Sequence, residues 1–455
     1  MTNSFQNFIL ICFTLLVSSC QWPTTGSSTV QLTSAVATAA AQGISALGRQ
    51  PHFNVVISDA ANGVCQAQAY ISQGAVKIPL PLPTAATLAT AKPKNWTATI
   101  DSLDLSTAGF QEGTAEISVA VQNCSIFKGK SNFAQNVTLD FTPPRVELTS
   151  SQHYINQAGA EVATYTVSDD AVWSGVVVGP NTFKGYVMPG ATSPADHFAF
   201  FVYSYNLPSG TPIEIKAIDA AGNERKTTLS PAKFFAKEFR HRDIPIDDHF
   251  IETKVADIIS NTPGMKSTGD ALSDFLAVNR DLRKINNQFL LDLAQKSEEK
   301  FYWKDAFRPL YNAAIEASFA DYRSYFYHDE KIDEQVHLGF DMAVVERNPI
   351  LAAAAGKILF AGYFGIYGNT VVIDHGYGIT TLYAHLSSID VRVGDFVTLD
   401  QKIANSGATG LAGGDHLHFS MLIQGVQTNP VEFWDQHWIQ DHVYLRLGAG
   451  KFGQM

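Results

Sequence analysis

Three short motifs in the C-terminal part of the sequence contain four histidines and an aspartate that could hold a metal ion. The motifs are His337-Leu-Gly-Phe-Asp341, Tyr383-Ala-His385-Leu386 and His416-Leu-His418-Phe419. A catalytic zinc site needs three protein ligands and an open fourth position for water or substrate. Four imidazoles and a carboxylate meet that need and leave two imidazoles for proton transfer. The motifs therefore predict metal-assisted hydrolysis.

The spacing within the motifs predicts how these side chains meet. His416 and His418 stand two positions apart, and side chains two apart on a strand lie on the same face. His337 and Asp341 can converge on a helix face or across a bend, and Gly339 between them favours the bend. The sequence contains no His-Glu-x-x-His motif, so the glutamate base of that metalloprotease class is absent. An imidazole that is not a ligand suits this role, because its pKa lies near neutrality.

The order of the three motifs resembles that of the lysostaphin or LytM-type zinc endopeptidases of bacterial cell-wall metabolism. The similarity covers the C-terminal quarter of the chain. The resemblance implies hydrolysis of peptide bonds in peptidoglycan cross-links or stems. It implies that one zinc ion is held by His337, Asp341 and His418. It also implies that His385 and His416 are the catalytic imidazoles, one accepting a proton and the other hydrogen-bonding the oxyanion, in either order.

A glycine-rich loop, residues 406–415, precedes the last motif. In the family this loop ends in Gly-Pro, whereas Asp415 stands in place of the proline here. The exchange removes no ligand. We expect it to alter the rigidity of the loop and the substrate preference.

The segment around these motifs, residues 331–435, predicts an antiparallel β peptidase domain. Apolar runs mark its strands and glycines mark its turns. The strand candidates are residues 357–361, 369–374, 379–383 and 416–423. Tyr383 can contact substrate or fill the core, and His375 is expected in a turn or behind the ligands. A C-terminal tail, residues 436–455, follows, and its histidines are expected at the surface or in packing.

Residues 231–330 differ from the rest, because helical periodicity replaces the strand pattern. Asp270 is a suitable N-cap, and apolar residues recur at helical spacing from Leu272 to Leu293. We expect an amphipathic helix of roughly 25 residues here, and a second helix around residues 307–318. Because this helical segment lies directly upstream of His337, it could border the catalytic groove and control access.

Two stretches upstream, residues 53–141 and 142–230, contain short strand patterns separated by glycine, proline and asparagine turns. They predict two antiparallel Ig-like β-sandwiches that act as spacer or binding modules. Cys65 and Cys124 fall in the first of them. Their separation suits a disulfide between strands on two facing sheets in an oxidising compartment, with two buried free thiols as the alternative.

The N-terminus predicts a targeting segment. The apolar run Phe8–Val17 is too short to cross a bilayer as a helix, which takes about 20 residues. The sequence Val17-Ser-Ser-Cys20 that follows resembles a bacterial lipobox. We therefore expect a signal peptide over residues 1–19, a lipid on Cys20 that attaches the chain to the membrane, and a polar tether over residues 20–52. A simple secretory signal that is cut elsewhere is the alternative. The segment departs from the usual pattern of such signals, because no lysine or arginine precedes the apolar run.

Composition and charge exclude some classes of function. A net charge of −11 argues against nucleic acid as a partner, because phosphate binding needs a basic face. A chain of 455 residues is too long for a single core. We therefore expect a multidomain, mainly β protein with an α-helical insert. Gln21 after the lipobox cysteine resembles the outer-membrane sorting class and predicts a periplasmic lipoprotein.

Two other functions fit parts of the sequence. A non-catalytic LytM-type adaptor would bind and activate a cell-wall amidase, but such adaptors typically lack one or more ligands. Residues 391–404 resemble half of a biotinyl or lipoyl carrier domain, but the lysine setting that such carriers need is absent. The zinc endopeptidase accounts for more of the sequence than either alternative.

Overall fold

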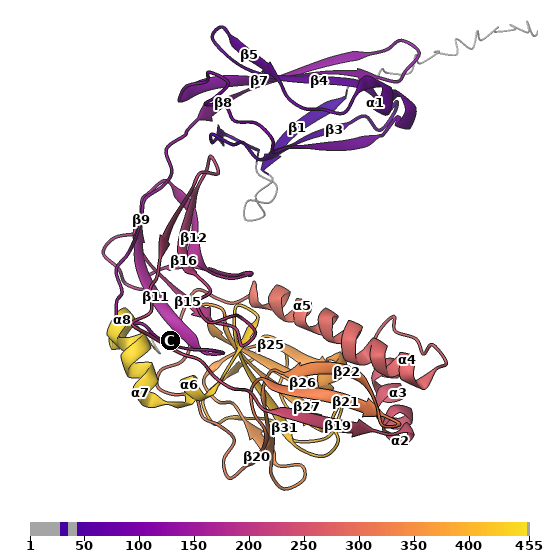
Figure 1. The fold of residues 1–455 in the computed structure, drawn as a ribbon, viewed down its shortest axis with the longest axis vertical. Helices are drawn as coiled ribbons and strands as arrows, with labels where there is room; N and C mark the ends of the chain where they lie inside the picture. Colours follow the sequence, from indigo (N-terminus) through magenta and orange to yellow (C-terminus); the bar gives the residue numbers. More distant parts are fainter. Residues whose placement is uncertain (1–27, 35–42, 453–455) are drawn as a thin grey trace, which may run out of the picture. The chain divides into compact units, whose positions relative to one another are not determined.

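The computed structural model describes residues 28–34 and 43–452, so the predicted signal peptide and Cys20 lie outside the described residues (Figure 1). The chain divides into two compact units, Met1–Phe141 and Thr142–Met455. Each unit is described by itself. None of the helices in the described part of the chain is both long and apolar enough to cross a membrane.

The first unit contains two antiparallel-rich sheets and one short helix, α1 (Ala85–Ala91). The strands of the three-stranded sheet are, in order, β1 (Thr29–Ser34), β3 (Phe53–Ser58) and β6 (Asn95–Ile100). Those of the five-stranded sheet are β2 (Ala46–Leu47), β8 (Lys130–Leu139), β7 (Gly113–Asn123), β4 (Val64–Gln73) and β5 (Val76–Pro79). Alternate residues of β3 are buried, as a strand with one face on a core requires.

Two expectations for this unit need correction. The tether predicted over residues 20–52 contains a strand of the folded unit. Thr29–Ser34 alternates polar and apolar residues and pairs with β3 over its whole length. The disulfide between Cys65 and Cys124 is present. It does not join facing sheets, however, because β4 and β7 are neighbours in one sheet, with Val64 opposite Asn123. A register irregularity at Cys65 accommodates the link.

The second unit begins with two four-stranded sheets. The strands of one are β14 (Tyr186–Val187), β15 (Asp196–Val202), β11 (Ala160–Val167) and β9 (Val146–Leu148). Those of the other are β13 (Asn181–Lys184), β12 (Ala171–Val178), β16 (Ile213–Asp219) and β17 (Glu224–Thr228). The short strands β10 (Tyr154–Asn156) and β18 (Lys233–Phe235) form a parallel pair.

The largest sheet of the second unit has eight strands and carries the motif residues. Its strands are, in order, β20 (Ala314–Ala317), β23 (Phe340–Ala343), β31 (Leu417–Ile423), β27 (Ile379–Leu386), β26 (Asn369–Gly376), β25 (Gly356–Tyr363) and β29 (Phe396–Val397), with β32 (Val426–Thr428) paired to β31. Two three-stranded sheets flank it: β19 (His241–Ile246), β21 (Asp321–Tyr327) and β22 (Glu330–His337), and β24 (Pro349–Leu351), β30 (Lys402–Asn405) and β28 (Ser388–Ile389). All four predicted strands of this region are present.

The predicted long helix is present as three consecutive pieces, α4 (Ala271–Leu276), the π-helical η3 (Ala277–Leu282) and α5 (Arg283–Ala294). The Asp270 side chain caps it by accepting a hydrogen bond from the Ser273 N–H. A shorter helical stretch precedes it: α2 (Asp248–Phe250), η2 (Ile251–Val255) and α3 (Ala256–Asn261). The helix predicted around residues 307–318 is wrong. Pro309 disfavours a helix there, and the segment ends in the strand β20 instead.

The short helix α6 (Val431–Trp434) ends the region predicted as the peptidase domain. The residues after it, expected as a tail, form helical turns that pack on the unit: α7 (Gln436–Trp438), η5 (Ile439–Tyr444), α8 (Leu445–Leu447) and η6 (Ala449–Lys451). Trp438, Ile439 and Val443 are buried. A further turn, η4 (Gly365–Tyr367), lies beside the long helix, where the Asn286 side chain accepts a hydrogen bond from the Ile366 N–H.

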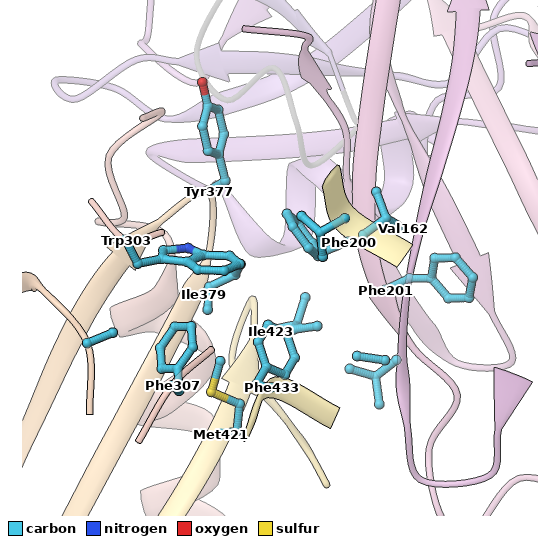
Figure 2. Packing of buried hydrophobic residues seen from close by; sticks show 14 of the residues in the cluster. Val162, Phe200, Phe201, Trp303, Phe307, Tyr377, Ile379, Met421, Ile423 and Phe433 are labelled. Atoms are coloured by element: carbon cyan, nitrogen blue, oxygen red, sulfur yellow. The ribbon is translucent and has the colours of Figure 1, made fainter. Parts of the chain in front are cut away.

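One hydrophobic core joins the β11–β15 sheet to the eight-stranded sheet. Figure 2 shows Phe200 of β15 near Ile423 of β31, with Trp303, Phe307 and Phe433 beside them. The ring centroids of Phe200 and Phe301 lie 6.2 Å apart. Burying such aromatic side chains gives about 1.5–3 kcal/mol each. The β11–β15 sheet and the sheet with the motifs therefore share one core.

Two buried carboxylates, Glu161 and Glu432, also link β10 and β11 to the C-terminal helical turns. Glu161 of β11 is fully buried and pairs with Arg446 and with His442 Nδ1, the latter at 3.0 Å. Glu432 of α6 accepts hydrogen bonds from Asn156 Nδ2 at 2.8 Å and the Ala160 N–H at 2.6 Å. Burial raises the pKa of Glu432 to about 7 from its ordinary value of 4.5, although both hydrogen bonds act to lower it.

The raised pKa of Glu432 predicts a pH-dependent stability. Below pH 4.5 the carboxyl is protonated in both states, whereas between 4.5 and 7 only the unfolded state loses its proton. The second unit should therefore lose about 3 kcal/mol of unfolding free energy as pH rises through this window, relative to Glu432→Gln. Denaturant unfolding of both proteins from pH 4 to 8 measures it. Parallel pH profiles would contradict the assignment.

Candidate functional site

The strand β31 brings the predicted residues together, because it pairs with β23 on one side and β27 on the other. Asp341 of β23 lies directly opposite His418, and Ala384, the neighbour of His385, lies opposite His418 on the other side. His337 ends β22, and the chain bends through Leu338 and Gly339 into β23. A Cβ atom at position 339 would lie 2.6 Å from the His418 ring, so only glycine fits the bend.

Three side-chain atoms converge on one point. His337 Nε2 lies 2.9 Å from Asp341 Oδ1 and 2.9 Å from His418 Nδ1. His418 Nδ1 lies 3.0 Å from the same Asp341 oxygen. All three side chains are almost fully buried. The structure thus brings together the three predicted ligands, and this His-Asp-His group could hold a metal ion.

Hydrogen bonds behind the two imidazoles decide which nitrogens carry protons. His337 Nδ1 lies 3.1 Å from the Ser318 carbonyl, which can only accept, so the lone pair of this ring is on Nε2. Ser420 Oγ donates its hydrogen to the Leu338 carbonyl at 2.7 Å. It must therefore accept from His418 Nε2–H at 2.9 Å, which leaves the lone pair of His418 on Nδ1.

The converging atoms are therefore electron-pair donors, which are stable this close together only around a cation or a shared proton. Burial lowers the pKa of His418 to about 4, so this ring is neutral at pH 7. Burial by itself would raise the pKa of Asp341, but His337 and the other neighbouring histidines hold it well below its usual range. Two imidazole nitrogens and an ionised carboxylate form the kind of donor set that zinc prefers.

Arg323 of β21 adds a contact that sequence reasoning missed. Its Nη2 donates to Asp341 Oδ2 at 2.7 Å, so the second carboxylate oxygen is held away from the converging atoms. Only Oδ1 then faces the two imidazoles. No motif in the sequence marks Arg323, because it belongs to a different strand and meets Asp341 only through the fold.

The two predicted catalytic imidazoles lie beside the His-Asp-His group. His385 Nδ1 donates to the Thr409 carbonyl at 2.8 Å, and His416 Nδ1 donates to the Gly414 carbonyl at 2.8 Å. Each ring therefore keeps Nε2 for chemistry. Their ring centroids are 4.9 Å apart. His416 Nε2 lies 3.4 Å from Asp341 Oδ1.

The backbone of His385 is held in an unusual conformation, with a φ of 61°. Residues other than glycine rarely adopt such left-handed angles, and they often do so at functional sites. The loop carbonyl of Thr409 fixes the ring of this residue. Strain at His385 is therefore consistent with a positioned catalytic group.

Asp415 ties the two ends of the glycine-rich loop together. Its Oδ1 accepts from Ser406 Oγ at 2.6 Å, and its Oδ2 accepts from the Arg347 N–H at 3.1 Å. Gly407 and His416 form a single β-bridge next to this contact. A carboxylate clamp thus stands where the resembling family has a proline, and it holds the backbone next to His416.

The five predicted residues line one pocket of about 130 Å³. Its other walls come from the long helix, strand β21, turn η4 and the glycine-rich loop: Arg283, Arg323, Tyr325, Ile366, Tyr367, Leu411, Ala412 and Gly413. The helical segment therefore borders the site, as its position upstream of His337 predicted. Its control of access stays a prediction.

The remaining histidines and Tyr383 have structural surroundings. Tyr383 is buried in the core, where its hydroxyl accepts a hydrogen bond from the Ala353 N–H at 2.8 Å. His375 is fully buried between the Ala355 carbonyl and Thr381 Oγ1. His442 pairs with Glu161, and His437 is exposed. None of these four is among the described residues that line the pocket.

Known proteins are similar to the C-terminal part of this chain. Residues 335–430 match Peptidase family M23, and the C-terminal part of the chain is an M23 peptidase domain. Over 97 residues the chain is 42% identical to DD-carboxypeptidase/endopeptidase Mpg of Neisseria meningitidis serogroup B, which covers 21% of this chain and 22% of that protein. Over 96 residues it is 35% identical to peptidoglycan DD-endopeptidase ShyA of Vibrio cholerae serotype O1, covering 21% and 22%. The chain thus spans about a fifth of the length of these curated relatives.

Solved structures also resemble parts of the chain. A peptidase M23 structure from Pseudomonas aeruginosa has a TM-score of 0.39 at 19% identity, covering 62% of this chain and 94% of that one. The catalytic domain of lysostaphin from Staphylococcus simulans has a TM-score of 0.21 at 25% identity, covering 32% and 96%. With TM-scores this low, we draw nothing further from these two structures.

The zinc content of two variants should distinguish the metal ligands from the catalytic imidazoles. His418→Ala removes one of three converging donors and should abolish stoichiometric zinc binding. His385→Ala removes a ring that is outside this group and should keep zinc. Elemental analysis of the dialysed proteins measures both, and loss of zinc from His385→Ala would show that the roles are misassigned.

Ser420 should matter for metal affinity although it cannot reach the ion. Ser420→Ala removes the acceptor that fixes the His418 tautomer, and zinc affinity should fall about 10- to 100-fold. Ser324→Ala, which removes a strand hydroxyl next to Glu334, is the matched control. Competition with a chromophoric chelator measures both constants. Equal affinities for the two variants would argue against a tautomer lock.

Proposed function

We propose that this protein is a zinc-dependent endopeptidase that hydrolyses peptide bonds in peptidoglycan cross-links or stems. The observation that carries the proposal is the convergence of the His337, Asp341 and His418 lone pairs beside two further imidazoles in one pocket. An adaptor that only binds an amidase would need none of these five groups to be intact. The enzymatic function is therefore the better supported of the two.

Each residue of the pocket has a role in this proposal. His337 Nε2, Asp341 Oδ1 and His418 Nδ1 would hold the ion, which when bound polarises a carbonyl and lowers the pKa of water. His385 and His416 supply the catalytic imidazoles, because a backbone carbonyl fixes the Nδ1–H of each ring and leaves its Nε2 on the side of the converging donors. One imidazole takes the proton of the attacking water and passes it to the leaving amine. The other hydrogen-bonds the oxyanion.

The substrate and the setting are inferred from the relatives and from the N-terminus. Two relatives carry the names DD-carboxypeptidase/endopeptidase and peptidoglycan DD-endopeptidase, which points to peptides of the cell wall. We propose that a lipid on Cys20 attaches the chain to the outer membrane on its periplasmic side. The two upstream β-sandwiches would then be Ig-like spacer modules between the anchor and the peptidase domain.

Digestion of purified peptidoglycan tests the proposal. The zinc-loaded protein should release peptide fragments that chromatography and mass spectrometry identify, and a chelator should stop the reaction. His385→Ala should reduce the rate about 10²- to 10⁴-fold, as for other general acid–base groups, while zinc stays bound. The amidase-adaptor function would be favoured instead if the zinc-loaded protein released nothing by itself but stimulated an added cell-wall amidase.

A further inference from the structure

The pocket has an excess of positive charge that the proposed chemistry does not use. The charged side chains among the described residues lining it are Arg283, Arg323 and Asp341, and a bound divalent cation would add further positive charge. The chain as a whole is acidic, with 43 acidic and 32 basic residues. General basicity therefore does not explain two guanidinium groups here. A cationic pocket in a low-dielectric surrounding attracts an anionic group.

Arg283 is held in place by a buried amide. Its Nε donates to the Asn279 carbonyl at 3.1 Å, and its Nη2 donates to Asn279 Oδ1 at 2.7 Å. Asn279 is fully buried, and its Nδ2 donates to Asp333 Oδ2 at 2.7 Å. The guanidinium therefore has a fixed orientation and no carboxylate partner among the described residues. Such pre-organisation lowers the entropy lost when a ligand binds.

The helix is also distorted at this point. Residues Ala277–Leu282, immediately before Arg283, form the π-helical turn η3. Single π-helical turns inside α-helices are rare and occur frequently at functional sites. Here the turn contains Asn279, the residue that orients the guanidinium. Helix geometry and side-chain bonding thus both place Arg283 at the pocket.

Arg323 also has one N–H group, at Nε, without a hydrogen-bond partner among the described residues. Its Nη2 is used on Asp341, but its buried Nε has no hydrogen-bond partner within the described part of the chain. Nearly all buried polar groups in native proteins are paired, so an unpaired one needs an explanation. An anionic ligand group in the pocket would supply a nearby negative charge for both arginines.

We infer that Arg283, together with Arg323 of the same pocket, binds a free α-carboxylate on the substrate residue that follows the scissile bond. This inference rests on the proposed peptidase function and specifies its substrate class. That carboxylate is attached to the same carbon as the leaving nitrogen, so it must lie close to the five residues around the bond. The planar guanidinium suits it, because two parallel N–H groups match two carboxylate oxygens. A peptide with a blocked carboxylate would leave the arginines unpaired and be rejected.

Paired peptides test the inference. The probes are N-acetyl-D-alanyl-D-alanine and its C-terminal amide, which differ only in the carboxylate. Isothermal titration of the zinc-loaded His385→Ala protein gives their dissociation constants with little turnover. Hydrolysis by the wild type gives kcat and KM for the same pair. A carboxylate bound by guanidinium groups should favour the free acid about 10- to 100-fold in Kd and in KM.

Variants of two neighbouring helix residues test whether Arg283 causes the preference for the free acid. Arg283→Met, in the His385→Ala background for titration, should bring the Kd of the acid close to that of the amide. Arg283→Lys should keep part of the preference, because lysine keeps the positive charge but lacks the two parallel N–H groups of the guanidinium. Lys284→Met removes the same charge from an exposed neighbouring position and should keep the full preference. Equal zinc content of all variants shows that the site is folded.

The outcomes separate this inference from the proposed function. Equal affinities of the His385→Ala protein for acid and amide, no binding of either, or a preference that survives the added Arg283→Met change would overturn the carboxylate role, whatever the activity on peptidoglycan. Preferential binding of the acid without hydrolysis of any peptide would leave the carboxylate site standing and count against the peptidase.

Discussion

The site depends on the register of a single strand. Strand β31 lies between β23 and β27, and the pairing of Asp341 with His418 places side chains 77 positions apart in contact. The bend at Gly339 then turns His337 back onto the same point. Because the backbone hydrogen bonds of three strands fix these positions, the donor atoms converge without help from flexible loops.

A second set of contacts fixes the chemistry of the rings. Carbonyl oxygens of the backbone accept from His337, His385 and His416, and Ser420 accepts from His418. All four tautomers are therefore defined by groups outside the pocket. Ser420 also bonds the Leu338 carbonyl inside the bend, so the orientation of His418 is linked to the backbone between the other two converging residues. A change in the backbone of the bend would therefore also change the orientation of the His418 ring.

The sequence predicted those parts of the site and the fold that depend on local patterns. The three motifs indicated which side chains meet, Gly339 indicated the bend, and Asp270 indicated the start of the long helix. The prediction failed where long-range packing decides. Arg323 and Arg283 reach the pocket from separate elements, and the segment near Pro309 follows sheet pairing instead of helical periodicity. The disulfide was predicted as a pair, but strand order, which local patterns do not reveal, placed it within one sheet.

The alternation along β31 has a consequence for how this domain can vary. His418 and Ser420 lie on one face of the strand, and His418 lines the pocket, whereas Leu417 and Phe419 are buried in the core on the other face. Deleting one residue inside the strand would exchange these faces, exposing the apolar side chains and burying an imidazole among them. Insertions in the surrounding turns carry only a small entropic cost. Natural variants of this domain should therefore differ in loop length while the length of this strand stays constant.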